Sequence, residues 1–215
     1  MKNDPSNFFI TRFFLNIFRE KSNLLDLNFD TRLLPEAGLL LLSEPFLDNE
    51  YFTRSVILLC EHNGKGSFGF VLNNFLEENF EGLPDYILES NPRISIGGPV
   101  EVSHLYFIHS YGEKVPGSSE LVNGLFLGGD FEILKSLLLA EDQPEKCVRY
   151  FLGYSGWDAQ QLNDEIKEKS WVVCRPENNT WIMNTENDNL WEDSLKSLGA
   201  KYEMFSKFPV NPNNN

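Results

Sequence analysis

The sequence predicts a single α+β domain of the αβ sandwich type, with helices on the faces of a mixed, largely antiparallel sheet. Short apolar runs bounded by turn residues follow one another directly from residue 38, and helical patterns alternate with such runs only later in the chain. The 215 residues, of which 41% are hydrophobic, exceed the usual size of one domain only slightly. We therefore expect one core and no second domain.

Residues 1–35 are expected to form a separate amphipathic helical extension. Apolar side chains crowd residues 8–18, while Arg12, Arg19 and Lys21 add positive charge. Polar residues such as Asn7, Thr11 and Arg12 interrupt the apolar run, so we do not expect a signal peptide. The helix is expected to pack on the domain or on a second subunit, which would give a homo-oligomer. A membrane surface is the alternative.

The first strands follow Pro35, at residues 38–43, 54–60 and 68–72. Residues 56–59 are apolar without alternation, which is typical of a strand covered on both faces. The glycine-rich connection over residues 62–67 suits a hairpin between the second and third strands.

The domain is expected to extend over residues 36–208. Its second half is predicted to contain both strands and helices. One helix covers residues 131–140 with Asp130 as N-cap. A second begins near Asp158, where Gln161 completes the spacing of a capping box, and a third covers residues 189–198. The tail, residues 209–215, is expected to be disordered. Further strands are expected at residues 94–96, 105–109, 125–128, 148–154, 171–174 and 181–183.

The charge balance opposes nucleic acid as a direct partner. The chain carries 32 acidic and 18 basic side chains, a formal net charge of -14, and affinity for phosphate backbones comes largely from Lys and Arg. A protein or small-molecule ligand is expected instead. The three cysteines include no C-x-x-C pair, which fits a reducing cytoplasm. Every long apolar stretch is interrupted by charged residues, so we expect no transmembrane segment.

The sequence offers one candidate catalytic pair and no metal site. Cys60 and His62 lie two residues apart on a predicted strand. They are therefore expected to share one face, with Glu61 on the other. A thiolate activated by the imidazole would make the protein a thiol-dependent enzyme. The other interpretation is a buried structural cysteine, because no third orienting group is identified. The histidines show no metal-ligand spacing, and no cofactor fingerprint is present, so no catalytic residue, metal or cofactor is assigned.

Several residues are candidates for binding. Arg54 precedes an apolar strand, where it could pair with Asp48 or Glu50 or hold an anionic ligand. Trp157 follows two glycines at a strand-to-helix junction, a place where such sheets bind ligands, although it could instead pack into the core. The candidates for a binding cleft are Arg54, His62, Asn73, Gly97, Gly98 and Trp157.

Five ordered motifs resemble the bacterial AlgH/YqgE family over about residues 37–200. They are GLLLLSEP at 38–45, FTRSVILLCEH at 52–62, GFVLN at 69–73, GGPV at 97–100 and GYSGWDAQQL at 153–162. The resemblance implies a compact αβ domain and supplies no catalytic residue. Proteins of this family are often labelled transcriptional regulators. The acidic charge of this chain and the lack of a helix-turn-helix pattern disfavour direct DNA binding. We expect a non-enzymatic cytoplasmic protein that regulates, or binds, through proteins or small ligands.

Overall fold

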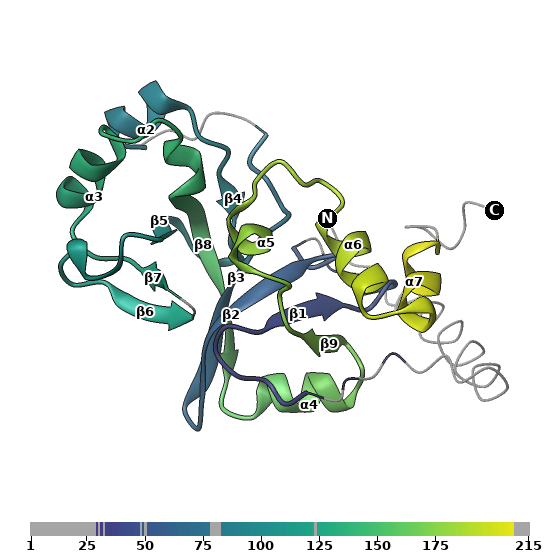
Figure 1. The fold of residues 1–215 in the computed structure, drawn as a ribbon. Coiled ribbons are helices and arrows are strands. Elements are labelled where there is room, and N and C mark those ends of the chain that lie inside the picture. The colour runs from purple at the N-terminus through teal and green to yellow at the C-terminus, as the bar shows by residue number, and fades with distance from the viewer. Residues whose placement is uncertain are drawn as a thin grey trace, which may run out of the picture.

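The computed structural model describes residues 29, 31, 33–47, 49, 51–77, 83–122 and 124–208 (Figure 1). Most of the expected N-terminal extension, residues 1–28, and the expected tail, residues 209–215, lie outside the described residues. A nine-stranded sheet has the order β6-β7-β5-β8-β3-β2-β1-β9, and β4 pairs with β8 off this path. Only the β4–β8 pairing is parallel among the described pairs. The predicted mixed, largely antiparallel sheet is confirmed.

The strands are β1 (Leu40–Ser43), β2 (Val56–Asn63), β3 (Gly66–Val71), β4 (Ser95–Ile96), β5 (Val100–His109), β6 (Ser119–Val122), β7 (Leu125–Leu127), β8 (Val148–Asp158) and β9 (Trp171–Cys174). The helices are α2 (Asp85–Ser90), α3 (Phe131–Leu138), α4 (Gln161–Lys167), α5 (Asn179–Met183), α6 (Leu190–Ser197) and α7 (Ala200–Ser206). Two short 3-10 helices are η1 (Gly112–Lys114) and η2 (Pro144–Lys146).

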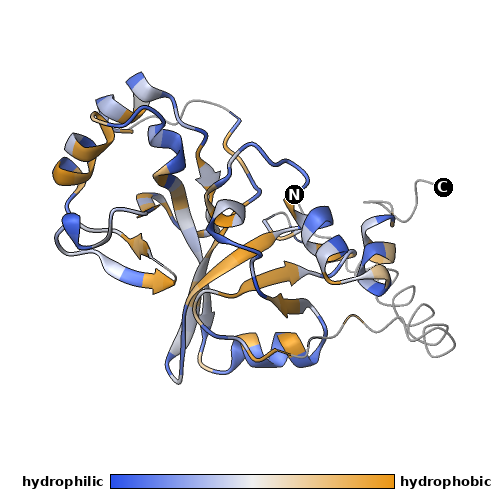
Figure 2. Ribbon diagram, in the orientation of Figure 1, coloured by the Kyte–Doolittle hydropathy of each residue, from blue (hydrophilic) through white to orange (hydrophobic). Residues whose placement is uncertain are grey.

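The apolar first part of β2, residues 56–60, is buried on both faces, as its uninterrupted apolar run predicts. Val56 and Leu58 belong to the core cluster that includes α6, whereas Ile57 and Leu59 belong to a second cluster with Leu162 of α4. Figure 2 shows apolar residues along β1, β2 and β9, and polar residues at the tip of the β2–β3 hairpin. A third cluster packs α2 and α3 against β5 and β8.

Residues 181–183, expected as a strand, form the end of α5 instead. Asn178 caps this helix by accepting a hydrogen bond from the Trp181 amide at 3.3 Å, and Ile182 is buried in the core. A short apolar run does not distinguish a buried helix from a strand, which explains the error. The predicted N-cap Asp130 is confirmed, because its carboxylate accepts from the amides of Glu132 and Ile133.

Gly97 and Gly98 lie where β4 runs closely against β8. The Gly97 amide donates to Leu152 O at 2.8 Å, and its carbonyl accepts from the Val71 amide at 2.9 Å. A Cβ on Gly97 would lie 2.3 Å from Gly153 O. Gly98 has φ +149, and a Cβ there would lie 2.4 Å from a backbone carbon of β8. Both glycines are therefore required by close backbone packing.

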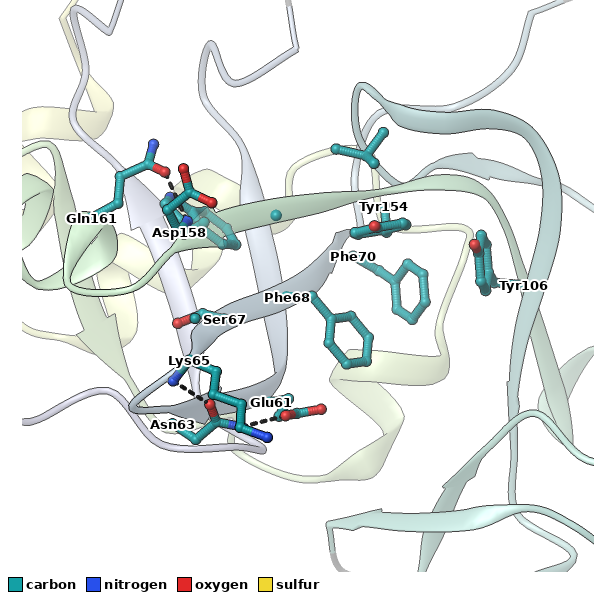
Figure 3. A pocket seen from close by; sticks show the side chains of 14 residues that line it. Glu61, Asn63, Lys65, Ser67, Phe68, Phe70, Tyr106, Tyr154, Asp158 and Gln161 are labelled. Carbon is teal, nitrogen blue, oxygen red and sulfur yellow. Dashed lines mark hydrogen bonds between the residues drawn. The ribbon is translucent and has the colours of Figure 1, made fainter.

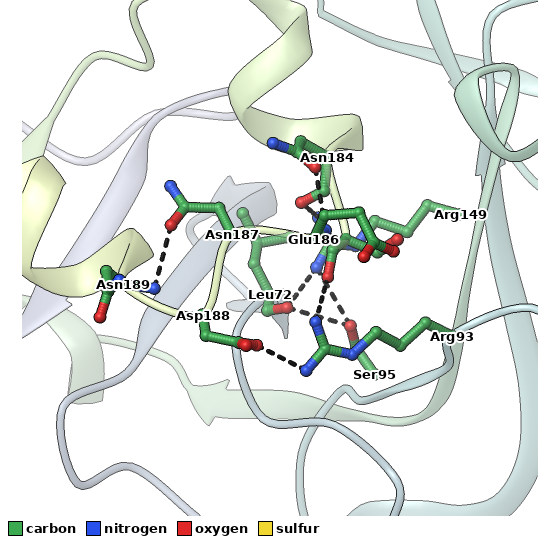
Figure 4. A network of polar contacts seen from close by, with 10 residues as sticks. Leu72, Arg93, Ser95, Arg149, Asn184, Glu186, Asn187, Asp188 and Asn189 are labelled. Atoms are coloured by element: carbon green, nitrogen blue, oxygen red, sulfur yellow. Dashed lines mark hydrogen bonds and ion pairs between the residues drawn. The ribbon is translucent and has the colours of Figure 1, made fainter.

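Arg149 on β8 is fully buried and ties α5 to the chain that follows β3 (Figure 4). Its guanidinium donates to the carbonyls of Leu72 and Ile182, and also to Ser95 Oγ at 3.1 Å. Burial, with the nearby charge of Arg93 as a second cause, lowers the pKa of Arg149. Carbonyl dipoles from separate segments therefore hold this cation in the core.

His109, at the end of β5, is a buried neutral imidazole. Nε2 lies 3.1 Å from Gly128 O, while Nδ1 lies 3.3 Å from the Tyr111 amide nitrogen, which must donate to it. These partners assign the proton to Nε2. Burial lowers the pKa of His109, with the Gly128 contact opposing this as a smaller cause.

The free energy of unfolding is expected to fall as the pH drops below about 6.5 because of His109. Its folded pKa is depressed, so the unfolded chain binds the proton first as the pH falls, and stability decreases until the folded pKa is reached. Urea unfolding at pH 8 and pH 5.5 measures this loss. The His109→Gln variant should show a smaller loss; an equal loss in both proteins would contradict the assignment.

Candidate functional site

A cleft of about 610 Å³ opens between the β2–β3 hairpin, β5 and β8 (Figure 3). It lies on the face of the sheet that α6 and α7 cover only near β1 and β9. The aromatic residues at its base therefore extend the main core cluster towards solvent. The lining residues are Glu61, Asn63, Lys65, Gly66, Ser67, Phe68, Phe70, Val100, Tyr106, Tyr154, Gly156, Trp157, Asp158 and Gln161.

Gly156 lines the cleft without a side chain, next to large aromatic residues. Glu61, Phe68 and Gly156 lie opposite one another on β2, β3 and β8, so they form one row across the sheet. A Cβ on Gly156 would lie 3.3 Å from the Tyr154 ring and would otherwise meet no atom closer than 3.8 Å. The hollow in the sheet surface is therefore at Gly156.

Four aromatic rings form the base and wall of the cleft. The Phe68 ring lies 6.1 Å from Phe70 and 6.0 Å from Tyr154, and both pairs are edge-to-face. Tyr106 is 5.7 Å from Phe70 and 5.8 Å from Tyr154. Figure 3 shows Tyr154 and Tyr106 edge-on beside the rings of Phe68 and Phe70. Phe70 is fully buried, and the other three rings are half-buried.

Carboxylates dominate the charge around these rings. Glu61 lies directly opposite Phe68, and Asp158 lies opposite Gly66 on the neighbouring strand. The Tyr106 hydroxyl donates a hydrogen bond to the Glu101 carboxylate. Desolvation, then the hydrogen bond and charge of Glu101, raise the pKa of Tyr106 to about 12, so its hydroxyl stays protonated. Lys65 is the single cationic residue among those that line the cleft.

Cys60 and His62 do not share a face, contrary to the sequence prediction. Leu59 lies opposite Gly69, but Glu61 lies opposite Phe68, so Cys60 is the extra residue of a β-bulge. The bulge shifts the alternation by one residue, which places Glu61 on the cleft face and His62 on the other. Burial raises the pKa of the Cys60 thiol. This geometry does not support a thiolate activated by His62.

His62 instead pairs with Ser67 across the hairpin, with Nδ1 2.7 Å from Oγ. In the part of the chain that the structure describes, no carboxylate forms a hydrogen bond with the second ring nitrogen. Figure 3 shows the Ser67 hydroxyl pointing away from Phe68. The pair therefore lacks the orienting group that activates a serine nucleophile.

Trp157 is held from the opposite side of the sheet by Glu165 of α4. Its indole Nε1 donates to Glu165 Oε2 at 2.9 Å, and Trp171 Nε1 donates to the same oxygen at 2.7 Å. Gln161 Nε2 donates to Glu165 Oε1 at 2.9 Å, and its own Oε1 accepts from the Asp158 amide. Trp157 is 7% exposed, so it supports the cleft from behind.

Of the six predicted binding residues, only Trp157 is among those that line the cleft. Arg54 donates to Phe208 O and lies over the Trp191 ring at 5.0 Å. Asn73 accepts from the Val56 amide and donates to Arg54 O, both at 2.8 Å. Gly97 and Gly98 pack against β8, and His62 lies on the far side of the hairpin. The structure therefore does not bring the six residues together.

The described residues contain no group of three or more His, Cys, Asp or Glu side chains placed to hold a metal ion. Within the same part of the chain, no helix is both long and apolar enough to cross a membrane.

Comparison with known proteins places this fold among bacterial relatives. A family model described as AlgH-like matches residues 40–203. A UPF0301 protein of Bacteroides thetaiotaomicron is 36% identical over 198 residues, covering 92% of this chain and 96% of the relative. UPF0301 protein BF2109 of Bacteroides fragilis is 37% identical over 207 residues, covering 93% and 97%.

Two solved structures share the fold. The DIP2367 protein of Corynebacterium diphtheriae aligns with a TM-score of 0.64 at 24% identity, covering 82% of this chain and 94% of its own. The AlgH protein of Pseudomonas aeruginosa aligns with a TM-score of 0.61 at 22% identity, covering 83% and 98%. At these identities the likeness concerns the fold alone.

Proposed function

The chain belongs to the AlgH-like family, and from this premise we propose that it is a non-enzymatic cytoplasmic protein that binds a ligand in the cleft between the hairpin, β5 and β8. The observation that carries the proposal is the cleft itself. Its volume of about 610 Å³ falls within the usual range for small-molecule sites, and aromatic residues with a few polar groups line it.

The residues around the cleft favour binding over catalysis. The Cys60 thiol is buried, and the Ser67–His62 pair has no carboxylate partner among the described residues. A regulatory role would then depend on ligand occupancy, with the signal passed to a partner protein. The net charge of -14 favours this route over direct contact with DNA.

Filling the hollow at Gly156 should abolish binding while the fold is retained. Gly156 has no positive φ, so leucine fits the backbone, and its side chain would occupy the space beside Phe68 and Tyr154. We expect ligands that shift backbone amide resonances of the cleft in a metabolite-library screen to lose at least about 10-fold in affinity in Gly156→Leu.

Gly64→Ala is the matched control, because a Cβ on Gly64 at the hairpin turn would meet no atom within 4 Å. Its affinity should equal that of the wild type. Undiminished binding by a folded Gly156→Leu protein, or a screen in which no compound shifts the cleft amides, would refute the proposed site.

A further inference from the structure

We propose that the ligand group held in this cleft is an organic cation, an alkyl guanidinium or alkylammonium. This inference rests on the proposed function, since it specifies the chemistry of the same site. Three features carry it: the aromatic rings, the placement of carboxylates beside them, and the size of the hollow.

The rings provide surfaces that attract positive charge. The half-buried rings of Phe68, Tyr106 and Tyr154 surround one end of the cleft, with Phe70 behind them. The face of an aromatic ring is the negative end of its quadrupole, and sites that recognise ammonium groups use several such rings together. Figure 3 shows these four rings in planes that differ in orientation, as in a partial cage.

The carboxylates are positioned to complete a cation site. Glu61 lies opposite Phe68 in the ladder, which places its side chain next to that ring, and its Oε1 accepts from Asn63 Nδ2. Glu101 accepts from Tyr106 at the other end of the aromatic group. Asp158 adds a third carboxylate, against the one ammonium of Lys65. The overall charge of -14 also favours the approach of a cation.

The hollow admits a short aliphatic cation. Gly156 adds no side chain to the cleft floor beside Tyr154, and the cleft volume of about 610 Å³ exceeds what a guanidinium with a four-carbon chain requires. An anionic ligand such as a nucleotide would meet Glu61 and Asp158 with only Lys65 to balance them. The structure thus favours a cation over a phosphate.

Calorimetric titration with butylguanidinium and with butylurea, its neutral isostere, tests the inference. We expect butylguanidinium to bind at least about 10-fold more tightly than butylurea and to weaken with added salt. Tyr154→Leu and Glu61→Gln should each reduce its affinity at least about 5-fold, whereas Lys65→Gln should increase it. Gly64→Ala should leave it unchanged.

The source of the cation is distinguished by a capped Ala-Arg-Ala peptide. Tighter binding of the peptide than of butylguanidinium would assign an arginine side chain of a partner protein, and weaker binding would assign a free amine or guanidine. Equal affinities for butylguanidinium and butylurea would overturn the inference. So would a screen in which only neutral or anionic compounds occupy the cleft, although the proposed function would then stand.

Discussion

Replacing Arg149 with methionine is expected to lower the free energy of unfolding by about 3–5 kcal/mol. The guanidinium is fully buried and satisfies the carbonyls of Leu72, Ile182 and Asn184, which come from different segments of the chain. Methionine fills similar volume but leaves buried acceptors without donors, and each such loss costs about 1–3 kcal/mol. Removing a desolvated charge offsets part of this cost. Thermal unfolding should show a midpoint lower by roughly 10 °C.

Arg93→Met is the matched control for Arg149. Arg93 reaches the same segment of chain, donating to Thr185 O at 2.6 Å and to Asp188 Oδ1 at 2.5 Å, but its side chain is 34% exposed. Water can replace these partners, so we expect the loss to be about 1 kcal/mol or less. A midpoint for Arg149→Met equal to or above that of the wild type would show that the desolvation cost exceeds the value of the hydrogen bonds.

Gly97→Ala is expected to destabilise the fold by about 3 kcal/mol, the upper part of the usual range for overpacking. The added Cβ would lie 2.3 Å from Gly153 O and 2.9 Å from the Phe70 ring. The first of these neighbours is backbone within the sheet, so relief would require β4 to move away from β8 and break the Gly97–Leu152 hydrogen bond. Urea unfolding measures the change in the free energy of unfolding.

Gly64→Ala again provides the comparison, because the same chemical change at the hairpin turn meets open space. Its unfolding midpoint should stay close to that of the wild type. A Gly97→Ala protein that is as stable as the wild type but no longer binds ligand would contradict the structural role. Gly97 would then be a binding residue.

Much of the fold follows from sequence patterns that depend on local chemistry. The apolar run of β2 predicts a strand covered on both faces, and Asp130 marks the start of α3 through its capping side chain. The end of α5 could not be predicted in the same way, because Trp181–Met183 is an apolar run too short to show a helical period. Its helical state depends on the Asn178 cap and on packing against the sheet.

The site was harder to predict because it depends on how strands pair. A bulge at Cys60 reverses the faces of Glu61 and His62, and nothing in the local sequence marks an extra residue there. Trp157 is fixed by Glu165 on the next helix. The residue that the sequence marks as a binding candidate therefore supports the sheet. The alternation of Tyr154, Gly156 and Asp158 was a usable signal, since it places a glycine between a tyrosine and an aspartate on one strand face.

The most direct test of the proposed site is a map of backbone amide shifts recorded while the compounds that bind are titrated into the wild-type protein. We expect the largest shifts to fall on residues 61–70, 100–106 and 154–158, which border the cleft. Shifts that gather elsewhere on the domain and leave these three segments unchanged would contradict it.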